Sequence, residues 1–221
     1  MMNNNSSKDN ILKRIQDAKQ TREFGSVFSV STDAGIYQPI EPDAVSCFKK
    51  ELEAINGQCE IFETLDELFS HLKKMLNVKN IETVFCRDSH ISAQLLKRDI
   101  PYTQNPDDFE TMKAAVTQCE FLIARTGSVV ASSAGESGRQ LISYPPVHIV
   151  LAGINQLVSY PKDAYDTIQK KYINNLPSQI TTITGPSRTS DIEKTLVLGA
   201  HGPKEFIVLL CNDESFNNFA I

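Results

Sequence analysis

Residues 59–86, CEIFETLDELFSHLKKMLNVKNIETVFC, decide the fold class. The two ends of this stretch, Cys59–Phe62 and Ile81–Cys86, are short apolar runs with little alternation, which is typical of strands covered on both faces. Between them, apolar residues from Leu68 to Leu76 recur at the spacing of one helix face. A strand, a helix and a second strand in this order predict a mostly parallel sheet with helices on both sides.

The same alternation continues on both sides of this stretch. Thr64 and Glu67 form a capping box at the start of the middle helix, and Ser89 is positioned to cap a helix through Lys97. After residue 125 the apolar runs come closer together, so a small antiparallel patch is expected there. The further helices are expected over residues 11–24, 42–57, 107–116 and 161–174, and the further strands over 120–124, 128–131, 147–152, 180–184 and 206–211.

The composition is that of an ordinary globular protein with one folded α/β domain. Of the 221 residues, 41% are hydrophobic and 22% are charged, and the formal net charge is −5. The mild acidity argues against a nucleic-acid binder. No apolar run approaches the roughly 20 residues of a membrane-spanning helix, and the polar start shows no secretory signal, so a cytoplasmic protein is expected. We expect a disordered tail over residues 1–10, an N-terminal helix and extended arm over 11–40, and the folded domain over 41–215.

Cysteine usage bears on cofactors. The five cysteines are odd in number and scattered, with no C-x-x-C pair, so a disulfide framework or a metal or iron–sulfur site built from this chain is not expected. Cys86 and His90 lie close in sequence, but two ligands are too few for a metal. Standard dinucleotide, P-loop, serine-hydrolase and zincin motifs are also missing. No cofactor is therefore expected in this chain, and any redox cofactor must come from elsewhere.

The richest polar segment, Gly185–Glu193, follows the expected strand over residues 180–184. A Gly-Pro pair turns the chain, Ser187 and Thr189 offer hydroxyl groups, and Ser190 with Glu193 predicts that a helix begins here. Free N–H groups at a helix start, beside the planar cation of Arg188, suit a carboxylate or phosphate. The alternative is a capped turn in which Arg188 pairs with a local acid.

Three other segments are weaker candidates. Gly199–Lys204 places two glycines around His201 and could fold back beside the Arg188 loop, although a plain hairpin turn explains it as well. Glycine-spaced hydroxyls in Thr126-Gly127-Ser128, and in Gly135–Arg139 with Arg139 closing the site, could cradle an anion. The alternative for the last segment is a flexible surface loop.

Two blocks near the carboxyl terminus make a family resemblance specific. The block ITGPSRTSDIE, residues 183–193, followed by LGAHGPK, residues 198–204, resembles the signature of the LUD-domain proteins of the lactate-utilization protein C (LutC/YkgG) family. Arg125–Ser128 and Tyr144–Ile149 are also similar to this family, and the resemblance covers roughly residues 10–212.

The resemblance implies a fold like that of sugar-phosphate isomerases and CoA transferases, a three-layer α/β/α sandwich with a mostly parallel central sheet. It implies a role in oxidising L-lactate to pyruvate, beside two iron–sulfur partner proteins. Because this chain lacks cluster-binding cysteines, it resembles the cluster-free member, and residues 41–215 are then its LUD domain. The positions that match the family motif are Gly185, Ser187, Arg188, Thr189, Asp191, Gly199, His201 and Gly202.

Three functions stay open at this point. The first is a non-redox subunit of a lactate-oxidising complex that binds a small carboxylate or phosphate anion or a partner surface. The second is an independent CoA transferase or phosphosugar enzyme, with Glu136 as the carboxylate nucleophile and His201 as a further catalytic candidate. The third is a non-catalytic assembly or regulatory subunit, and self-association is open in each case.

Overall fold

The computed structural model describes residues 7–20, 37, 39–189, 197–213 and 216. The chain divides into two compact units, residues 1–39 and residues 40–221. The first unit contains helix α1 (Ser7–Gln20), whose apolar side chains Ile11, Leu12 and Ile15 are exposed. The expected extended arm falls almost entirely outside the described residues. Among the described helices, none is both long and apolar enough to cross a membrane.

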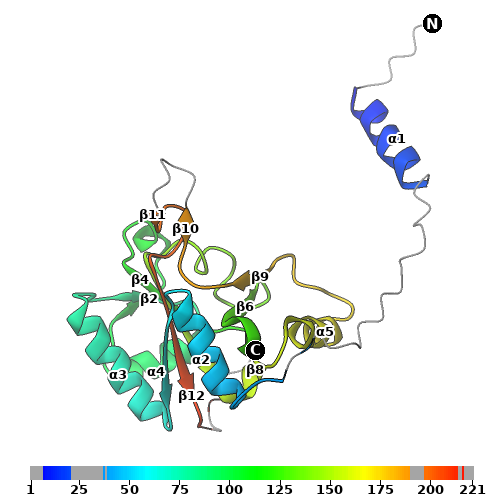
Figure 1. The fold of residues 1–221 in the computed structure, drawn as a ribbon. Helices are drawn as coiled ribbons and strands as arrows, with labels where there is room; N and C mark the ends of the chain where they lie inside the picture. Colours follow the sequence, from blue (N-terminus) through cyan, green and yellow to red (C-terminus); the bar gives the residue numbers. More distant parts are fainter. Residues whose placement is uncertain (1–6, 21–36, 38, 190–196, 214–215, 217–221) are drawn as a thin grey trace, which may run out of the picture. The chain divides into compact units, whose positions relative to one another are not determined.

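The second unit is built on a parallel sheet (Figure 1), as the alternating pattern predicts. Six of the described strands pair in the order β1-β12-β7-β4-β2-β3, and every pairing is parallel. The two longest strands, β12 and β7, lie side by side near the centre and are buried almost throughout. The strands are β1 (Gln58–Phe62), β2 (Val84–Phe85), β3 (Tyr102–Thr103), β4 (Ala114–Thr117), β7 (Val147–Gly153) and β12 (Glu205–Cys211).

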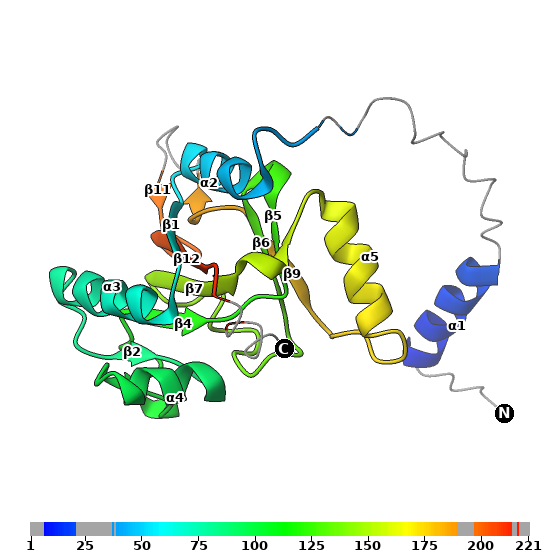
Figure 2. The same ribbon diagram turned by 90° about the horizontal axis from the view of Figure 1, so that it is seen from below.

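Helices cover both faces of this sheet (Figure 2). Helices α3 (Leu65–Val78) and α4 (Ser89–Lys97) pack on one face through an apolar cluster that includes Leu72, Leu95 and Ile149. Helix α2 (Ala44–Ala54) packs on the other face, where Phe48 and Leu52 contact the alternate side chains of β7 and β12. The α/β fold class expected from the sequence is thus confirmed.

A second sheet shares the α2 side of the molecule. Four described strands pair in the order β8-β5-β6-β9; β6 is antiparallel to both of its neighbours, and β5 and β8 are parallel. Helix α5 (Pro161–Lys171) covers the outer face of this sheet through Ala164 and Ile168. The expected antiparallel patch is therefore present and larger than anticipated. Its strands are β5 (Phe121–Ile123), β6 (Ser128–Ser132), β8 (Leu157–Val158) and β9 (Ile180–Ile183), with the short helices η2 (Ala124–Thr126) and η3 (Ile154–Gln156) between them.

Two expectations about helices are wrong. The segment 107–116 is not a helix: a single 3₁₀ turn, η1 (Pro106–Asp108), precedes strand β4 in the middle of the sheet. Burial on both faces decides its conformation, since all four residues of β4 are buried. Ser89 is not the cap of α4 either. The cap is Asp88, whose carboxylate accepts from the N–H of Ile91, and Ser89 is the first helical residue.

Candidate functional site

The chain leaves the neighbouring strands β2 and β4 toward opposite faces of the parallel sheet. After β2 it enters α4, which packs with α3. After β4 it enters β5, which packs on the α2 side. In open parallel sheets, such a divergence leaves a crevice at the carboxyl ends of the two strands, and ligands bind there. We call the carboxyl ends of β2 and β4 the switch point.

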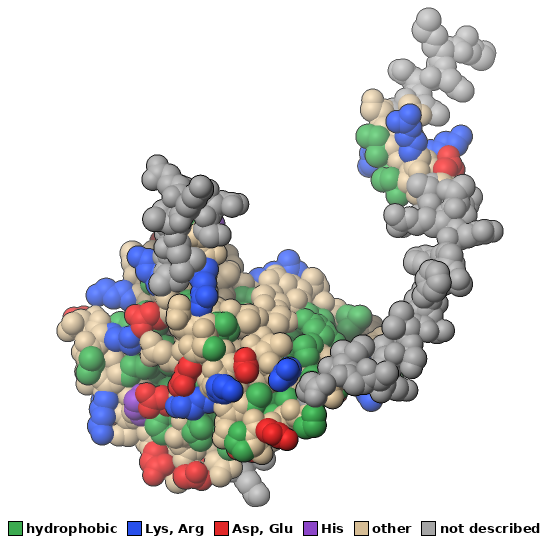
Figure 3. All heavy atoms as spheres, viewed as in Figure 1, with side chains coloured by type: hydrophobic (Ala, Val, Ile, Leu, Met, Phe, Trp, Pro, Cys, Tyr) green, Lys and Arg blue, Asp and Glu red, His purple; other side chains and the backbone are tan. Residues whose placement is uncertain are grey.

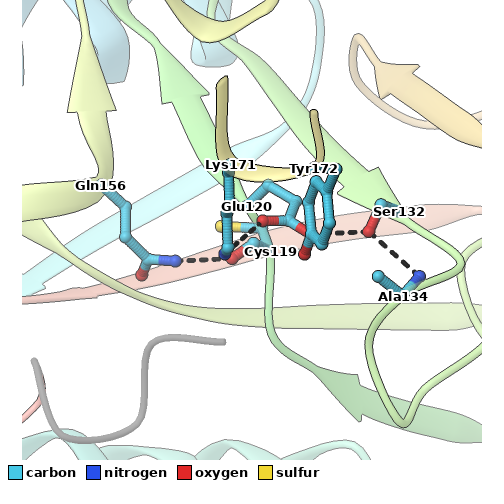
Figure 4. Close-up of polar contacts among 7 residues, drawn as sticks. All are labelled: Cys119, Glu120, Ser132, Ala134, Gln156, Lys171 and Tyr172. Atoms are coloured by element: carbon cyan, nitrogen blue, oxygen red, sulfur yellow. Dashed lines mark hydrogen bonds and ion pairs between the residues drawn. The ribbon is translucent and has the colours of Figure 1, made fainter. Parts of the chain in front are cut away.

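A buried glutamate lies at the switch point, just after β4 (Figure 4). The side chain of Glu120 is 1% exposed, and one carboxylate oxygen accepts from Ser132 Oγ at 2.6 Å and Tyr172 Oη at 2.8 Å. The other oxygen pairs with Lys171 Nζ at 3.0 Å. Its partners come from β6 and from the end of α5, so this cluster joins the parallel sheet's edge to the second sheet and its helix. Every oxygen of this buried charge is satisfied, as burial requires.

Gln118, two residues before Glu120 in the chain, bonds the N-cap of α4. Its Nε2 atom donates to Asp88 Oδ1 at 3.2 Å, and both side chains are buried. Burial raises the pKa of Asp88, and the nearby charge of Glu136 raises it further, against the hydrogen bond from the N–H of Ile91. Gln118 Oε1 is buried without a hydrogen-bond partner in the part of the chain that the structure describes.

Glu136 reaches the start of α4 from the loop over residues 133–146. Its carboxylate accepts from the backbone N–H of Ser89 at 2.5 Å and from Ser89 Oγ at 3.1 Å. These two hydrogen bonds hold the pKa of Glu136 below its usual value. A carboxylate stabilised in this way is a weakened nucleophile, so the geometry does not favour the transferase role considered for Glu136.

The loop that carries Glu136 closes over a small enclosed cavity. The cavity has a volume of about 10 Å³ and is lined by Gln118, Cys119, Glu120, Ser132 and by Gly135, Ser137 and Gly138 of the loop. Arg139, expected to close an anion site, instead donates to Ser178 Oγ. A second cation, Arg87, lies beside the loop near Gly138, and its guanidinium lies over the rings of Phe85 and Phe109, 5.4 and 5.7 Å from their centroids.

The two glycine-bearing turns near the carboxyl terminus are hydrogen-bonded to each other. The N–H of Ser187 donates to Pro203 O at 2.8 Å, and the N–H of Gly199 donates to Ser187 O at 2.9 Å. They lie at the amino edge of the parallel sheet, because the N–H of Lys204, just before β12, bonds Pro146 O, just before β7. The strand before Gly185, β9, belongs to the second sheet, so the rule about carboxyl ends of parallel strands does not apply to this segment.

Arg188 has a structural partner at this amino edge. Its guanidinium donates to the carbonyl oxygen of Ile55, the residue that ends α2. A cation at the carboxyl end of a helix satisfies a free carbonyl and suits the helix dipole. Arg188 and Thr189 form strand β10 (Arg188–Thr189), paired antiparallel with β11 (Val197–Leu198), and His201 is exposed. Asp191 and the helix expected at Ser190 lie outside the described residues.

The segment Thr126-Gly127-Ser128 packs against α2. Thr126 is exposed, whereas Ser128 is buried and its Oγ lies 2.9 Å from Thr184 Oγ1. Gly127 has φ +58°, and a Cβ atom added there would lie 2.3 Å from the backbone nitrogen of Leu52. This glycine therefore permits the close approach of a helix backbone, which accounts for it without a ligand.

Metal-ligating groups and surface charge bear on the ligands that this protein could bind. The described ranges contain no group of three His, Cys, Asp or Glu side chains placed to hold a metal ion. Lys and Arg side chains alternate with Asp and Glu over the face that carries α2 and α3 (Figure 3).

One protein family matches this chain over most of its length. The LUD domain family model matches residues 45–211, three quarters of the chain. The chain belongs to the LUD domain family. A structure of a DUF162 family protein from Deinococcus radiodurans has the same fold, with a TM-score of 0.59 over 76% of this chain and 96% of that chain, at 17% identity.

Curated relatives of this LUD domain protein match over a shorter span. An uncharacterized protein of Neisseria meningitidis is 34% identical over 122 residues, 55% of this chain and 52% of that protein. Lactate utilization protein C of Bacillus subtilis is 33% identical over 112 residues, 50% of this chain and 47% of that protein. The chain thus spans about half the length of the curated relatives it matches.

Sequence reasoning missed the buried polar residues of this LUD domain. The signal was present: Thr117-Gln118-Cys119-Glu120 places polar side chains directly after a strand. Because the apolar spacing predicts a helix over residues 107–116, the sequence does not predict a strand there. The polar side chains at the carboxyl end of that strand therefore do not stand out as a candidate site. Asp88 comes from one distant segment and the adjacent pair Lys171 and Tyr172 from another, so only the fold brings them to Gln118 and Glu120.

Proposed function

We propose that this protein acts in lactate utilization, as a cytoplasmic subunit of a system that oxidises L-lactate to pyruvate. The observation that carries the proposal is the LUD domain match over residues 45–211, together with relatives in several Bacillus and Geobacillus species named lactate utilization protein C. The residues that resemble the family signature, 183–193 and 198–204, lie within that match.

We assign the protein the role of a cluster-free subunit beside iron–sulfur partner proteins. All five cysteines are buried as free thiols, and burial raises the pKa of Cys59 and of Cys86 to about 12. Cluster ligation needs several thiolates close together in one place, and these five thiols lie in two separate apolar clusters. Electron transfer is therefore assigned to the partners, and this chain is assigned binding of a small carboxylate or phosphate anion.

Two places in the fold support binding of that anion. One is the amino-edge segment of Gly185, Ser187, Arg188, Thr189, Gly199, His201 and Gly202, where the resemblance predicts it. The guanidinium of Arg188 has donors beyond the one that Ile55 O accepts. The other is the switch point, where buried polar residues converge at the carboxyl ends of parallel strands.

Loss of the gene tests this role. In the source organism, a deletion strain should consume L-lactate several-fold more slowly than the parent, and a plasmid copy should restore the rate. Consumption of glucose should not change, which excludes a general growth defect. A tagged copy should copurify with iron–sulfur proteins, whose absorbance near 400 nm identifies them. Unchanged L-lactate consumption in the deletion strain would refute the proposed function.

A further inference from the structure

We infer that the switch point is the binding site for a small 2-hydroxy acid, and that Glu136 occupies the seat of the ligand's carboxylate in the present structure. The inference rests on the proposed function for the choice of ligand. Its geometry rests on three features of the described residues: a carboxylate already held by Ser89, an unpartnered buried acceptor on Gln118, and a small cavity lined by Gln118 and by the loop that carries Glu136.

The carboxylate seat is the first turn of α4. Ser89 supplies a backbone N–H and a hydroxyl group to the carboxylate of Glu136, while the N-cap Asp88 accepts from the N–H of Ile91 in the same turn. A ligand carboxylate of the same size can replace that of Glu136 on these donors. Because one carboxylate replaces another, the charge beside Asp88 does not change, so the nearby acids do not oppose the exchange.

Gln118 supplies the second contact. Its side chain is 6% exposed and lines the cavity, and its Nε2 atom is held by Asp88, which orients the amide. The remaining Oε1 atom has no partner among the described residues and can only accept a hydrogen bond. A buried acceptor without a donor costs free energy, which a ligand hydroxyl group would recover. A 2-hydroxy acid carries such a hydroxyl group beside its carboxylate.

The loop over residues 133–146 must open for this ligand to enter. The cavity under Gly135, Ser137 and Gly138 has a volume of about 10 Å³, room for roughly one water molecule. Glu136 is part of the same loop, so its release from Ser89 would both free the seat and let the loop move. Arg87 lies at the rim: a Cβ atom added to Gly138 would lie 3.9 Å from its Nη1. None of the described side chains forms an ion pair with Arg87, which leaves its charge for the incoming acid.

Isothermal titration calorimetry on the full chain tests this site with two ligands. L-lactate and propionate differ by the hydroxyl group alone. Glu136→Gln removes the competing charge and should bind L-lactate at least fivefold more tightly than the wild type. In Glu136→Gln, L-lactate should bind about tenfold more tightly than propionate, as one hydrogen bond to a buried acceptor predicts.

Matched variants separate this site from the amino edge. Adding Gln118→Met to Glu136→Gln keeps the side-chain length but removes the acceptor, so the preference for L-lactate should fall below twofold. Lys170→Met, which changes an exposed charge outside both places, should leave the binding of L-lactate unchanged, whereas Arg188→Ala decides between the two places. The comparison of ligands within Glu136→Gln needs no change at Gln118, so the test survives if the double variant does not fold.

Three results would overturn the inference. They are L-lactate binding to Glu136→Gln that is no tighter than to the wild type, equal affinities of Glu136→Gln for L-lactate and propionate, and loss of binding on Arg188→Ala. The deletion strain reports on the proposed function separately. Slow L-lactate consumption combined with any of these three results would refute the switch-point site and leave the proposed function standing, whereas tight, hydroxyl-dependent binding with normal consumption would do the reverse.

Discussion

His148 is a titratable side chain enclosed by the interior of the parallel sheet. It lies on β7, 1% exposed, with Nε2 2.8 Å from Thr117 Oγ1 and its ring 5.3 Å from the ring of Phe206. Its Nδ1 atom has no hydrogen-bond partner within the described ranges. Burial lowers the pKa of His148 to about 3, so the imidazole is neutral in the folded protein at neutral pH.

This burial makes folding stability depend on pH. The imidazole of an unfolded chain takes up a proton below about pH 6.5, whereas the folded protein excludes that proton until about pH 3. The unfolded state therefore binds more protons across this window, and stability falls as the pH falls. Between pH 7 and pH 5, the free energy of unfolding of the wild type should fall by about 2 kcal/mol more than that of His148→Gln.

Urea unfolding of both proteins at several pH values measures this difference. The raised pKa of Asp88 acts in the opposite direction, but it is present in both proteins and cancels in the comparison. Parallel pH profiles for the wild type and His148→Gln would show that His148 does not control the acid sensitivity.

Helix α2 and the turn after β5 show how one residue sets the distance between elements. Gly127 and Gly138 have almost the same backbone conformation, with φ +58° and φ +64°. A Cβ atom at Gly127 would lie 2.3 Å from the backbone of α2, whereas at Gly138 the one atom of the described residues within 4 Å would be Arg87 Nη1, at 3.9 Å. The two positions thus share the cost of a left-handed residue and differ in the space around it.

We therefore expect unequal effects from the same substitution. Gly138→Ala should cost about 1 kcal/mol, the cost of the left-handed backbone alone. Gly127→Ala should cost about 3 kcal/mol, because α2 must also move away from the turn. Thermal unfolding followed by circular dichroism gives both values, and a variant that does not fold counts as the larger cost. Equal losses would mean that α2 is not held by this close approach.

The elements that local signals define were predictable, and those that tertiary burial defines were not. The capping box of Thr64 and Glu67 begins α3 as expected, and the apolar run of β12 forms a strand. In contrast, Phe109, Met112 and Val116 have helical spacing although the chain there enters β4. Each of these three residues packs against the apolar core, but they do not share one face. Phe109 and Met112 pack with Phe85, whereas Val116 packs on the opposite face of the sheet. Periodicity alone does not distinguish these cases.

At the scale of the whole molecule, strand order determines which polar residues meet. The motif over residues 183–204 was visible in the sequence, and its two turns do lie together, but at the amino edge of the parallel sheet. The switch point depends on β2 and β4 being neighbours although they are separated by β3 in the chain. No local pattern encodes that order, so Gln118 and Glu120 could not be assigned from the sequence to a common site with Asp88.

The same arrangement makes Lys171 a link between layers. It is the last residue of α5, and its ammonium neutralises Glu120 at the junction of the two sheets. Lys171→Met would leave a buried carboxylate without its counter-ion, which typically costs 3–5 kcal/mol. Because the Lys171 side chain is 35% exposed, water partly compensates, and we expect a loss of about 2 kcal/mol in urea unfolding.

Two comparisons identify the cause of that loss. Lys170→Met removes the neighbouring, exposed charge of α5 and should change stability by less than about 0.5 kcal/mol. Adding Glu120→Gln to Lys171→Met removes the uncompensated charge while keeping an acceptor for Ser132 and Tyr172, so most of the stability should return. If the double variant is as unstable as Lys171→Met, packing of the lysine stem rather than its charge holds α5 to the sheets, and the buried carboxylate is then stabilised by its hydroxyl donors alone.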